Sequence, residues 1–197
     1  MKSTAHLPDT LALLTSLLAQ KDRRTAEHCS RVMWYAGRIA YEMNLEESAI
    51  EVVRDASLLH DVGKVRVPDA ILNHPGKLDD AWVELVRSHA LHGEQILLRF
   101  PGRHMRDVAK LVGAHHERFD GTGYPRGLRG SGIPLGARII AVSDAFDAMT
   151  ARRPYRSGWS FGRAIEELMA CAGTQFDPDV VATFISINDE RIFRISS

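Results

Sequence analysis

Apolar residues recur along most of this chain at steps of three and four, which is the spacing of one face of an α-helix. Near the N-terminus, Leu11, Leu14, Leu17 and Leu18 follow this spacing and predict an amphipathic helix of about three turns. Further helices are predicted, in chain order, over residues 23–43, 46–60, 80–99, 105–116, 137–150, 160–172 and 177–187.

The same pattern predicts which faces are buried. The second helix should bury Val32, Ala36, Ile39 and Ala40, and the third Ile50, Val53, Ala56, Leu58 and Leu59. No alternation of strand and helix patterns suggests a parallel sheet. We therefore predict an all-α fold, a single-domain helical bundle of about seven helices over residues 1–197. Residues 1–21 carry the N-terminal helix, and residues 188–197 are a tail that forms a short strand or frays.

Two segments interrupt the helical pattern. Residues 65–80 contain Pro68, Pro75 and Gly76 and should form a structured connector. Residues 119–136 hold six glycines and two prolines, which makes them the longest helix-poor stretch. A loop of that length in a compact domain is more often functional than idle.

Composition excludes some functions. Lys+Arg and Asp+Glu both number 25, so no net charge attracts duplex nucleic acid or an anionic membrane, although a small phosphate ligand remains compatible. The longest apolar stretch is far shorter than the roughly 20 residues of a membrane span, and it does not resemble a leader. Cys29 and Cys171 form no CxxC motif, so we expect a reducing cytoplasm, with both cysteines packed as small hydrophobes.

His60 and Asp61 form the first candidate site, at the end of the third predicted helix. Adjacent imidazole and carboxylate groups can chelate one metal and bridge to another. A chain with nine histidines also contains chance neighbours, and the pair could instead interact with the helix dipole. More candidate ligands follow at intervals: His89, His115, His116 and Asp144. This succession suggests a metal-centred hydrolase.

Other residues have both a chemical and an ordinary interpretation. His28, three residues after Thr25, could be a ligand or a surface or core histidine. Lys64 could offer its ammonium to a phosphate where Gly63 lets the chain turn, or it could be an exposed lysine. Asp144 and Asp147 lie one turn apart in an apolar helix, so they either face water or are paired. His92 shares a helix face with His89, as a decoy or a supporting group.

Read together, HDVGK, VPDAILNHPGKL, SHALHG, HHERFDGTGYP and SDAFDAMTARRPYR closely resemble the HD-GYP family. This family is a branch of the HD superfamily of metal-dependent phosphohydrolases, and its members hydrolyse cyclic di-GMP. The resemblance covers residues 22–187, and AGTQFDPDVV belongs to it. It implies a helical bundle of the HD-domain type.

The resemblance implies a two-metal site. Asp61 would bridge the ions, His28, His60 and Asp144 would complete one metal's protein shell, and His89, His115 and His116 the other's. Iron or manganese suits such ligands, with nickel, cobalt and zinc as alternatives. Two ions about 3.5–4 Å apart activate a bridging hydroxide.

Further roles follow from the same resemblance. Lys64 would contact the scissile phosphate, and Asp22 and Asp147 would orient water, ligands or Lys64. The loop residues Gly121, Gly123, Tyr124 and Pro125 would approach the substrate. Arg153 and Arg156 would bind the guanine or the second phosphate, unless they belong to a solvated loop.

One position departs from the family's pattern. Some members carry a Glu one helical turn before the first histidine and hold three metals, whereas this chain has Arg24 there. A cation cannot be a ligand, and Glu27 projects in another direction. We therefore expect a dinuclear site.

We expect a cyclic di-GMP phosphodiesterase that forms pGpG and, less readily, GMP. One alternative is another cyclic dinucleotide as substrate, such as cyclic GMP-AMP. The other is a weakly catalytic module that senses a ligand or docks to a protein. Regulatory or diguanylate-cyclase proteins acting in trans, or a second copy in a homodimer, are the candidate protein partners.

Overall fold

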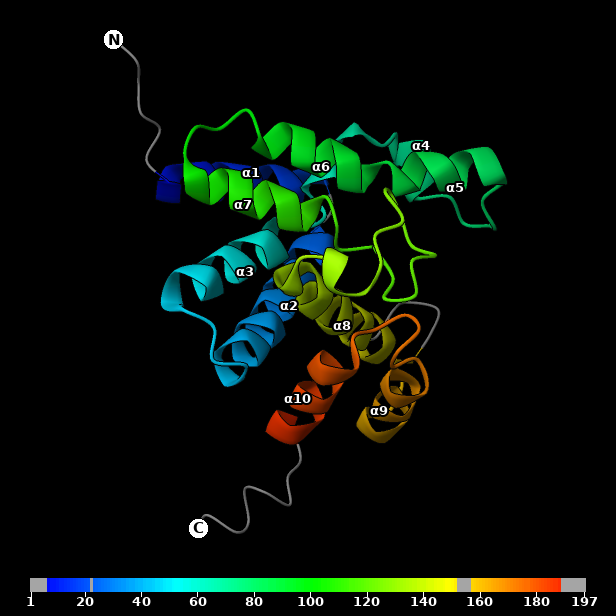
Figure 1. The fold of residues 1–197 in the computed structure, drawn as a ribbon. Coiled ribbons are helices and arrows are strands. Elements are labelled where there is room, and N and C mark those ends of the chain that lie inside the picture. Colours follow the sequence, from blue (N-terminus) through cyan, green and yellow to red (C-terminus); the bar gives the residue numbers. More distant parts are fainter. Residues whose placement is uncertain (1–6, 22, 152–156, 189–197) are drawn as a thin grey trace.

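The computed structural model describes residues 7–21, 23–151 and 157–188, and within them it contains α-helices, 3₁₀ turns and loops but no named strand (Figure 1). The all-α prediction is confirmed. The helices are α1 (Leu7–Lys21), α2 (Arg23–Glu42), α3 (Glu47–Leu59), α4 (Asp69–Leu72), α5 (Asp80–Arg87), α6 (His89–Leu97), α7 (Arg103–Val112), α8 (Leu135–Thr150), α9 (Phe161–Ala170) and α10 (Pro178–Asn188), with 3₁₀ turns η1 (Val62–Arg66) and η2 (Gly130–Gly132).

The described residues form ten α-helices, more than the seven or so that the pattern predicts. The predicted helix over 80–99 is divided into α5 and α6 at Ser88, whose hydroxyl donates to the Leu85 carbonyl at 2.6 Å. The connector 65–80 includes the one-turn helix α4. The predicted helix over 105–116 ends at Val112, so the doublet His115–His116 lies in the turn that follows.

The core forms where α2 packs against α3 and α8. All four residues of the predicted α2 stripe are fully buried, and so are Ile50, Val53, Ala56 and Leu59 of α3, whereas Leu58 is only partly buried. Burial of one Leu or Ile side chain contributes about 1.5–3 kcal/mol. Small residues bring the helices close: a Cβ on Gly136 would lie 2.5 Å from Leu111 Cδ1.

Most helices gather at two opposite ends of the molecule, and a long loop runs between these ends. In Figure 1, α1, α4, α5, α6 and α7 lie at the upper end, and α9 and α10 lie at the lower end. The segment between α7 and α8 crosses from one end to the other, and α2 and α8 run through the middle. This arrangement brings the ends of α3 and α7 and the start of α6 to one place.

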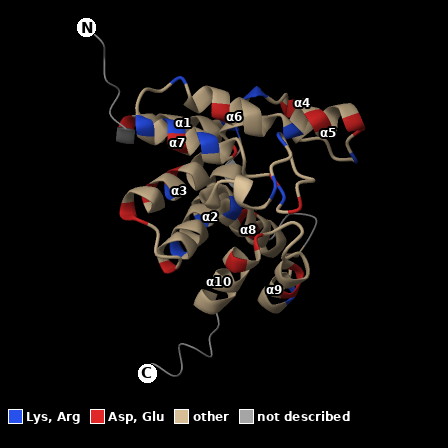
Figure 2. Ribbon diagram, in the orientation of Figure 1, with Lys and Arg blue, Asp and Glu red and all other residues tan. Residues whose placement is uncertain are grey.

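Charge is distributed evenly. Figure 2 shows acidic and basic positions interspersed over the helices rather than gathered on one face. This fits the balanced composition of the chain. Within the part of the chain that the structure describes, no helix is long and apolar enough to cross a membrane.

Candidate metal centre

The HD segment is held tightly against α6. His60 is the C-cap of α3, and Asp61 leads into η1. A Cβ on Gly63 would lie 1.9 Å from the His89 carbonyl oxygen and 2.5 Å from Gly93 N. Gly63 does not have a left-handed φ, so this close approach, rather than a turn, explains the glycine. The contact places His89 beside Asp61.

Three histidines share one hydrogen-bonding arrangement. The Nδ1 atoms of His60, His89 and His115 each donate to the carbonyl three residues earlier, at 2.7, 2.6 and 2.7 Å. A carbonyl oxygen can only accept, so Nδ1 carries the proton and Nε2 carries the lone pair. A hydrogen bond from one ring nitrogen fixes the orientation of a histidine whose other nitrogen binds a metal.

His28 is held in an equivalent way by a carboxylate. Its Nδ1 lies 2.7 Å from Asp147 Oδ2, and its Nε2 lies 3.0 Å from Asp144 Oδ1. Asp147 is buried and is also bound by Arg31, whose Nε donates to Oδ1 at 2.6 Å. Asp147 is therefore paired and does not face water.

The predicted ligands meet in groups of donor atoms that lie within 4.8 Å of one another. One group contains His28, His60 and Asp144, and another contains His89, His115 and His116. Asp61 lies between them: its Oδ1 is 3.5 Å from His89 Nε2, and its Oδ2 is 3.6 Å from His60 Nε2. The structure therefore brings the seven residues together, and their roles as metal ligands remain a prediction.

Electrostatics keep one group neutral. Burial lowers the pKa of His115 well below its usual value, and His116 adds to this effect. Burial also lowers the pKa of His116 to about 4 and lowers that of His89. Neutral imidazoles offer lone pairs, so this group is suited to a cation at neutral pH.

In contrast to these neutral histidines, Asp61, Asp144 and Lys64 are charged. Burial opposes a charge on Asp61, but the Lys64 ammonium and then His60 outweigh it and hold the Asp61 pKa well below its usual range. Lys64 Nζ lies 2.7 Å from Asp61 Oδ2. Burial also opposes a charge on Asp144, yet the hydrogen bond from His28 lowers its pKa to about 2.

Tyr124 of the GYP segment contacts the centre through a histidine. Its ring stacks on His116 with centroids 4.8 Å apart and planes at 29°. The Arg87 guanidinium carbon lies 5.3 Å from the Tyr124 ring centroid. Tyr124 is thus a neighbour of a predicted ligand, positioned by packing.

The loop around Tyr124 is attached at several points. The buried Glu117 carboxylate accepts backbone N–H bonds from Arg126 at 2.7 Å and Leu128 at 3.0 Å. The Arg126 side chain pairs with Glu94. A Cβ on Gly123 would lie 2.2 Å from Arg118 N, so the close backbone approach expected of the loop glycines is made to the chain itself. Gly121 has φ +84°, a left-handed value that glycine permits.

Some predicted residues lie outside the described part of the chain, and others were not predicted. Asp22, Arg153 and Arg156 fall outside it, as does the side chain of Arg24. Pro125 is half-buried in the loop. Sequence reasoning missed Arg31, Glu117, Arg87 and the position of Cys29, whose sulfur lies within 4.8 Å of donor atoms of His60 and Asp61. Only Arg31 had a local signal, because it lies one turn from His28.

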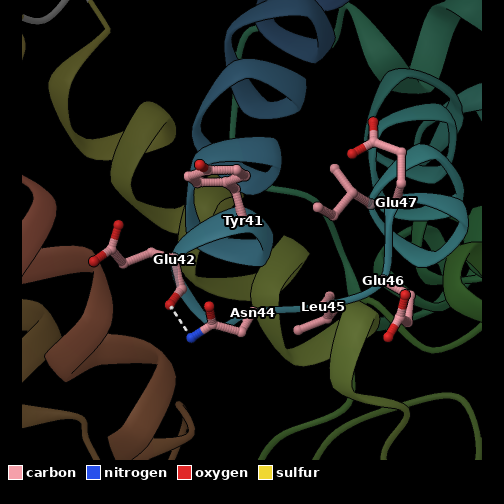
Figure 3. A pocket seen from close by; sticks show the side chains of 7 residues that line it. Tyr41, Glu42, Asn44, Leu45, Glu46 and Glu47 are labelled. Carbon is pink, nitrogen blue, oxygen red and sulfur yellow. Dashed lines mark hydrogen bonds between the residues drawn. The ribbon is translucent and has the colours of Figure 1, made fainter.

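Two surface hollows have different relations to the centre. One lies where α2 meets α3 and is lined by Tyr41, Glu42, Glu46 and Glu47 (Figure 3). Glu42 is 14 residues from His28 on α2, roughly 20 Å at 1.5 Å per residue. The other hollow is lined by His116 and Asp144 among others, so only this one adjoins the centre.

The family model described as HD domain matches residues 12–180. The chain therefore belongs to the HD domain family, and the resemblance stated from the motifs is confirmed.

Curated relatives share more than a third of their aligned residues with this chain. It is 40% identical over 179 residues to "3′3′-cGAMP-specific phosphodiesterase 2" of Vibrio cholerae. The aligned region covers 91% of this chain and 34% of the relative. It is 38% identical over 182 residues to the "Cyclic di-GMP phosphodiesterase" of Thermotoga maritima, and the aligned region covers 92% of this chain and 50% of the relative. The chain thus spans half or less of the length of these relatives.

Solved structures share the fold. A cyclic GMP-AMP specific phosphodiesterase of V. cholerae aligns with a TM-score of 0.68 at 22% identity, over 93% of this chain and 49% of that one. The HD domain of the phosphodiesterase PgpH of L. monocytogenes in complex with cyclic-di-AMP aligns with a TM-score of 0.61 at 18% identity, over 90% and 96%. At these identities the similarity supports the helical architecture alone.

Proposed function

We propose that this chain is a metal-dependent phosphodiesterase that hydrolyses cyclic di-GMP to linear pGpG. The observation that carries the proposal is the set of imidazoles with Nδ1 committed to a hydrogen bond. His60, His89 and His115 each present an Nε2 lone pair to a centre that also contains Asp61 and Asp144, and His28 Nε2, which faces Asp144, offers its lone pair once the imidazole is neutral. An ordinary buried core has no need for so many aligned lone pairs.

The donor set fits two divalent ions. One position has two nitrogens and one oxygen, from His28, His60 and Asp144, and the other has three nitrogens, from His89, His115 and His116. Asp61, between the groups, would bridge. Mixed imidazole and carboxylate ligands suit iron or manganese. Two such ions supply an activated water and stabilise the charge on the attacking and departing oxygens.

The chain's own residues then bind and orient the substrate. Hydrolysis adds one water across a P–O3′ bond of the ring and leaves a 5′-phosphate and a 3′-hydroxyl. The Lys64 side chain is partly exposed, with 28% of it accessible, and its ammonium can bind a phosphate oxygen while it remains near Asp61. Asp147 fixes the ring of His28, which is the role that its contacts support.

A second substrate has specific support. The relatives named for 3′3′-cGAMP and for cyclic di-GMP are 40% and 38% identical to this chain, so identity does not separate the two. Both substrates have the same phosphodiester ring and differ in one base. The metal centre would act on either, and contacts to the bases decide between them.

A substrate panel tests the proposal. The protein, loaded anaerobically with Mn²⁺ or Fe²⁺, is incubated with cyclic di-GMP, 3′3′-cGAMP or cyclic di-AMP, and products are separated by chromatography. We expect pGpG as the first product from cyclic di-GMP. If the protein hydrolysed 3′3′-cGAMP alone, the substrate assignment would change to 3′3′-cGAMP. If it hydrolysed none of the three, the proposed function would be refuted.

Paired variants connect activity to the centre. His60→Ala with Asp61→Ala should abolish hydrolysis, because His60 belongs to two donor groups and Asp61 lies between His60 and His89. His74→Ala is the matched control, since His74 lies in the 65–80 connector and is exposed. Metal content of the same samples shows whether lost activity follows lost metal.

A further inference from the structure

A buried thiol lies beside the HD pair. Cys29 follows His28 on α2 and is fully buried. Its sulfur, a nitrogen of His60 and a carboxylate oxygen of Asp61 lie within 4.8 Å of one another. All three residues are almost closed to solvent, at 0%, 1% and 2% exposure. The thiol is therefore part of the polar centre as well as of the α2 stripe.

The spacing is compatible with one ion. Zinc bonds of about 2.3 Å to sulfur and about 2.0 Å to nitrogen or oxygen place tetrahedral donor atoms roughly 3.5 Å apart. A group already within 4.8 Å needs side-chain shifts of about an ångström. The Nδ1 of His60 is occupied by the Ser57 carbonyl at 2.7 Å, so Nε2 is the nitrogen available.

The Cys29 group differs in chemistry from its neighbour. Thiolate is a soft ligand that favours zinc, whereas imidazole with carboxylate also suits iron and manganese. His60 belongs to the Cys29 group and to the group with His28 and Asp144. Because one nitrogen lone pair binds one ion, the two positions compete for His60.

We propose that Cys29 is a metal ligand and forms, with His60 and Asp61, a position for a thiophilic divalent ion such as zinc. This inference deepens the proposed function and rests on its metal centre. When the ion binds, the S–H bond of Cys29 breaks, a sulfur–metal bond forms, and the proton passes to the buffer with no change of oxidation state. The added thiolate charge reduces the positive charge that the centre offers to a phosphodiester. The zinc form should therefore be the less active one.

The second cysteine provides an internal control. The chain has two cysteines. Cys171 is half-buried at the end of α9, with its sulfur 3.6 Å from Glu167 Oε1. In a Cys171→Ser variant, any sulfur–metal signal must come from Cys29.

Cobalt absorption tests the ligand directly. The protein is stripped of metal with a chelator and titrated anaerobically with Co²⁺, whose bond to thiolate gives an intense near-ultraviolet charge-transfer band that nitrogen and oxygen ligands do not give. We expect the band in the unaltered chain and in Cys171→Ser, and its loss in Cys29→Ser and Cys29→Ala. The absence of the band from Cys171→Ser would overturn the inference without any change at a buried position, as would a band that persists in Cys29→Ala.

Metal preference gives a second readout. Cys29→Ala should weaken Zn²⁺ binding about tenfold or more and leave Mn²⁺ binding unchanged. Equal weakening of both would indicate a structural effect and contradict the inference. A cobalt–thiolate band in a protein whose manganese form hydrolyses no cyclic dinucleotide would refute only the proposed function, and hydrolysis without the band would refute only this inference.

Discussion

Arg31 and Asp147 form a two-point contact between α2 and α8. Arg31 Nε donates to Asp147 Oδ1 at 2.6 Å, and Nη2 donates to Oδ2 at 3.0 Å. Asp147 Oδ2 also accepts from His28 Nδ1. The guanidinium thus fixes the carboxylate, and the carboxylate fixes the imidazole.

Asp147→Asn should weaken metal binding about 10- to 100-fold at one of the two positions, because the amide cannot serve both Arg31 and His28 as an acceptor. Competition with a chelator measures the affinity. Asp69→Asn is the control, since that side chain is 71% exposed on α4. Equal metal affinities in the two variants would show that Asp147 does not position His28.

Two histidines on α6 provide a matched pair. His89→Ala should remove one metal ion per chain, because His89 shares a donor group with His115 and His116. His92→Ala should retain full metal content, since His92 is partly exposed and its Nδ1 lies 3.3 Å from Ser88 Oγ. Metal analysis after gel filtration compares them, and loss of metal from His92→Ala would show that the ligand assignment is incomplete.

The sequence predicts the helices because they depend on local spacing, whereas the set of donor residues comes from the resemblance of its motifs to the HD-GYP family. The α2 stripe and the position of His60 at a helix end follow from periodicity alone. Partners far apart in sequence do not: Arg31 and Asp147 are separated by 116 positions. No spacing rule brings these two positions together.

Two other features depend on tertiary packing. Gly63 occurs in the HDVGK motif, but glycine is needed there because the backbone of α6 lies close to it. This contact cannot be inferred without the position of α6. Cys29 fits the apolar stripe of α2, and hydrophobic patterning cannot distinguish a packed thiol from a ligand. The helical pattern over 80–99 is continuous, so it does not indicate the division at Ser88.

The stability of the metal-stripped protein should fall between about pH 6.5 and 9. Burial opposes a charge on His28, but hydrogen bonds to Asp144 and Asp147 outweigh it and raise its pKa from 6.5 to about 9. A raised pKa means that folding stabilises the protonated form. This contribution is complete below pH 6.5 and is lost as the pH rises through 9, and it amounts to at most about 3 kcal/mol.

Urea unfolding of the stripped protein across this pH range measures the effect, with His28→Asn as the comparison. The variant should lack the decline. The manganese-saturated protein should behave oppositely and gain stability with pH, since a metal binds the neutral imidazole. A parallel decline in the unaltered chain and in His28→Asn would assign the effect to another group.

Glu117→Gln should loosen the loop that carries Tyr124. The carboxylate accepts two backbone N–H bonds, and an amide retains only one acceptor oxygen. We expect a loss of about 1–3 kcal/mol in unfolding free energy and faster hydrogen exchange at the Arg126 and Leu128 amides. Glu51→Gln, an exposed change on α3, is the control. Unchanged exchange at both amides would show that the loop is held by its other contacts.

Gly63→Ala should both destabilise the fold and release metal. The new Cβ would lie 1.9 Å from the His89 carbonyl oxygen, so α6 and the HD segment must separate. We expect a loss of about 3 kcal/mol, measured by urea unfolding, with reduced metal content because His89 moves away from Asp61. Gly162→Ala is the matched control on α9, where a Cβ meets nothing within 4 Å. That change should be neutral or stabilise the protein by up to about 1 kcal/mol. Full metal content and stability in Gly63→Ala would mean that the contact between η1 and α6 does not position the centre.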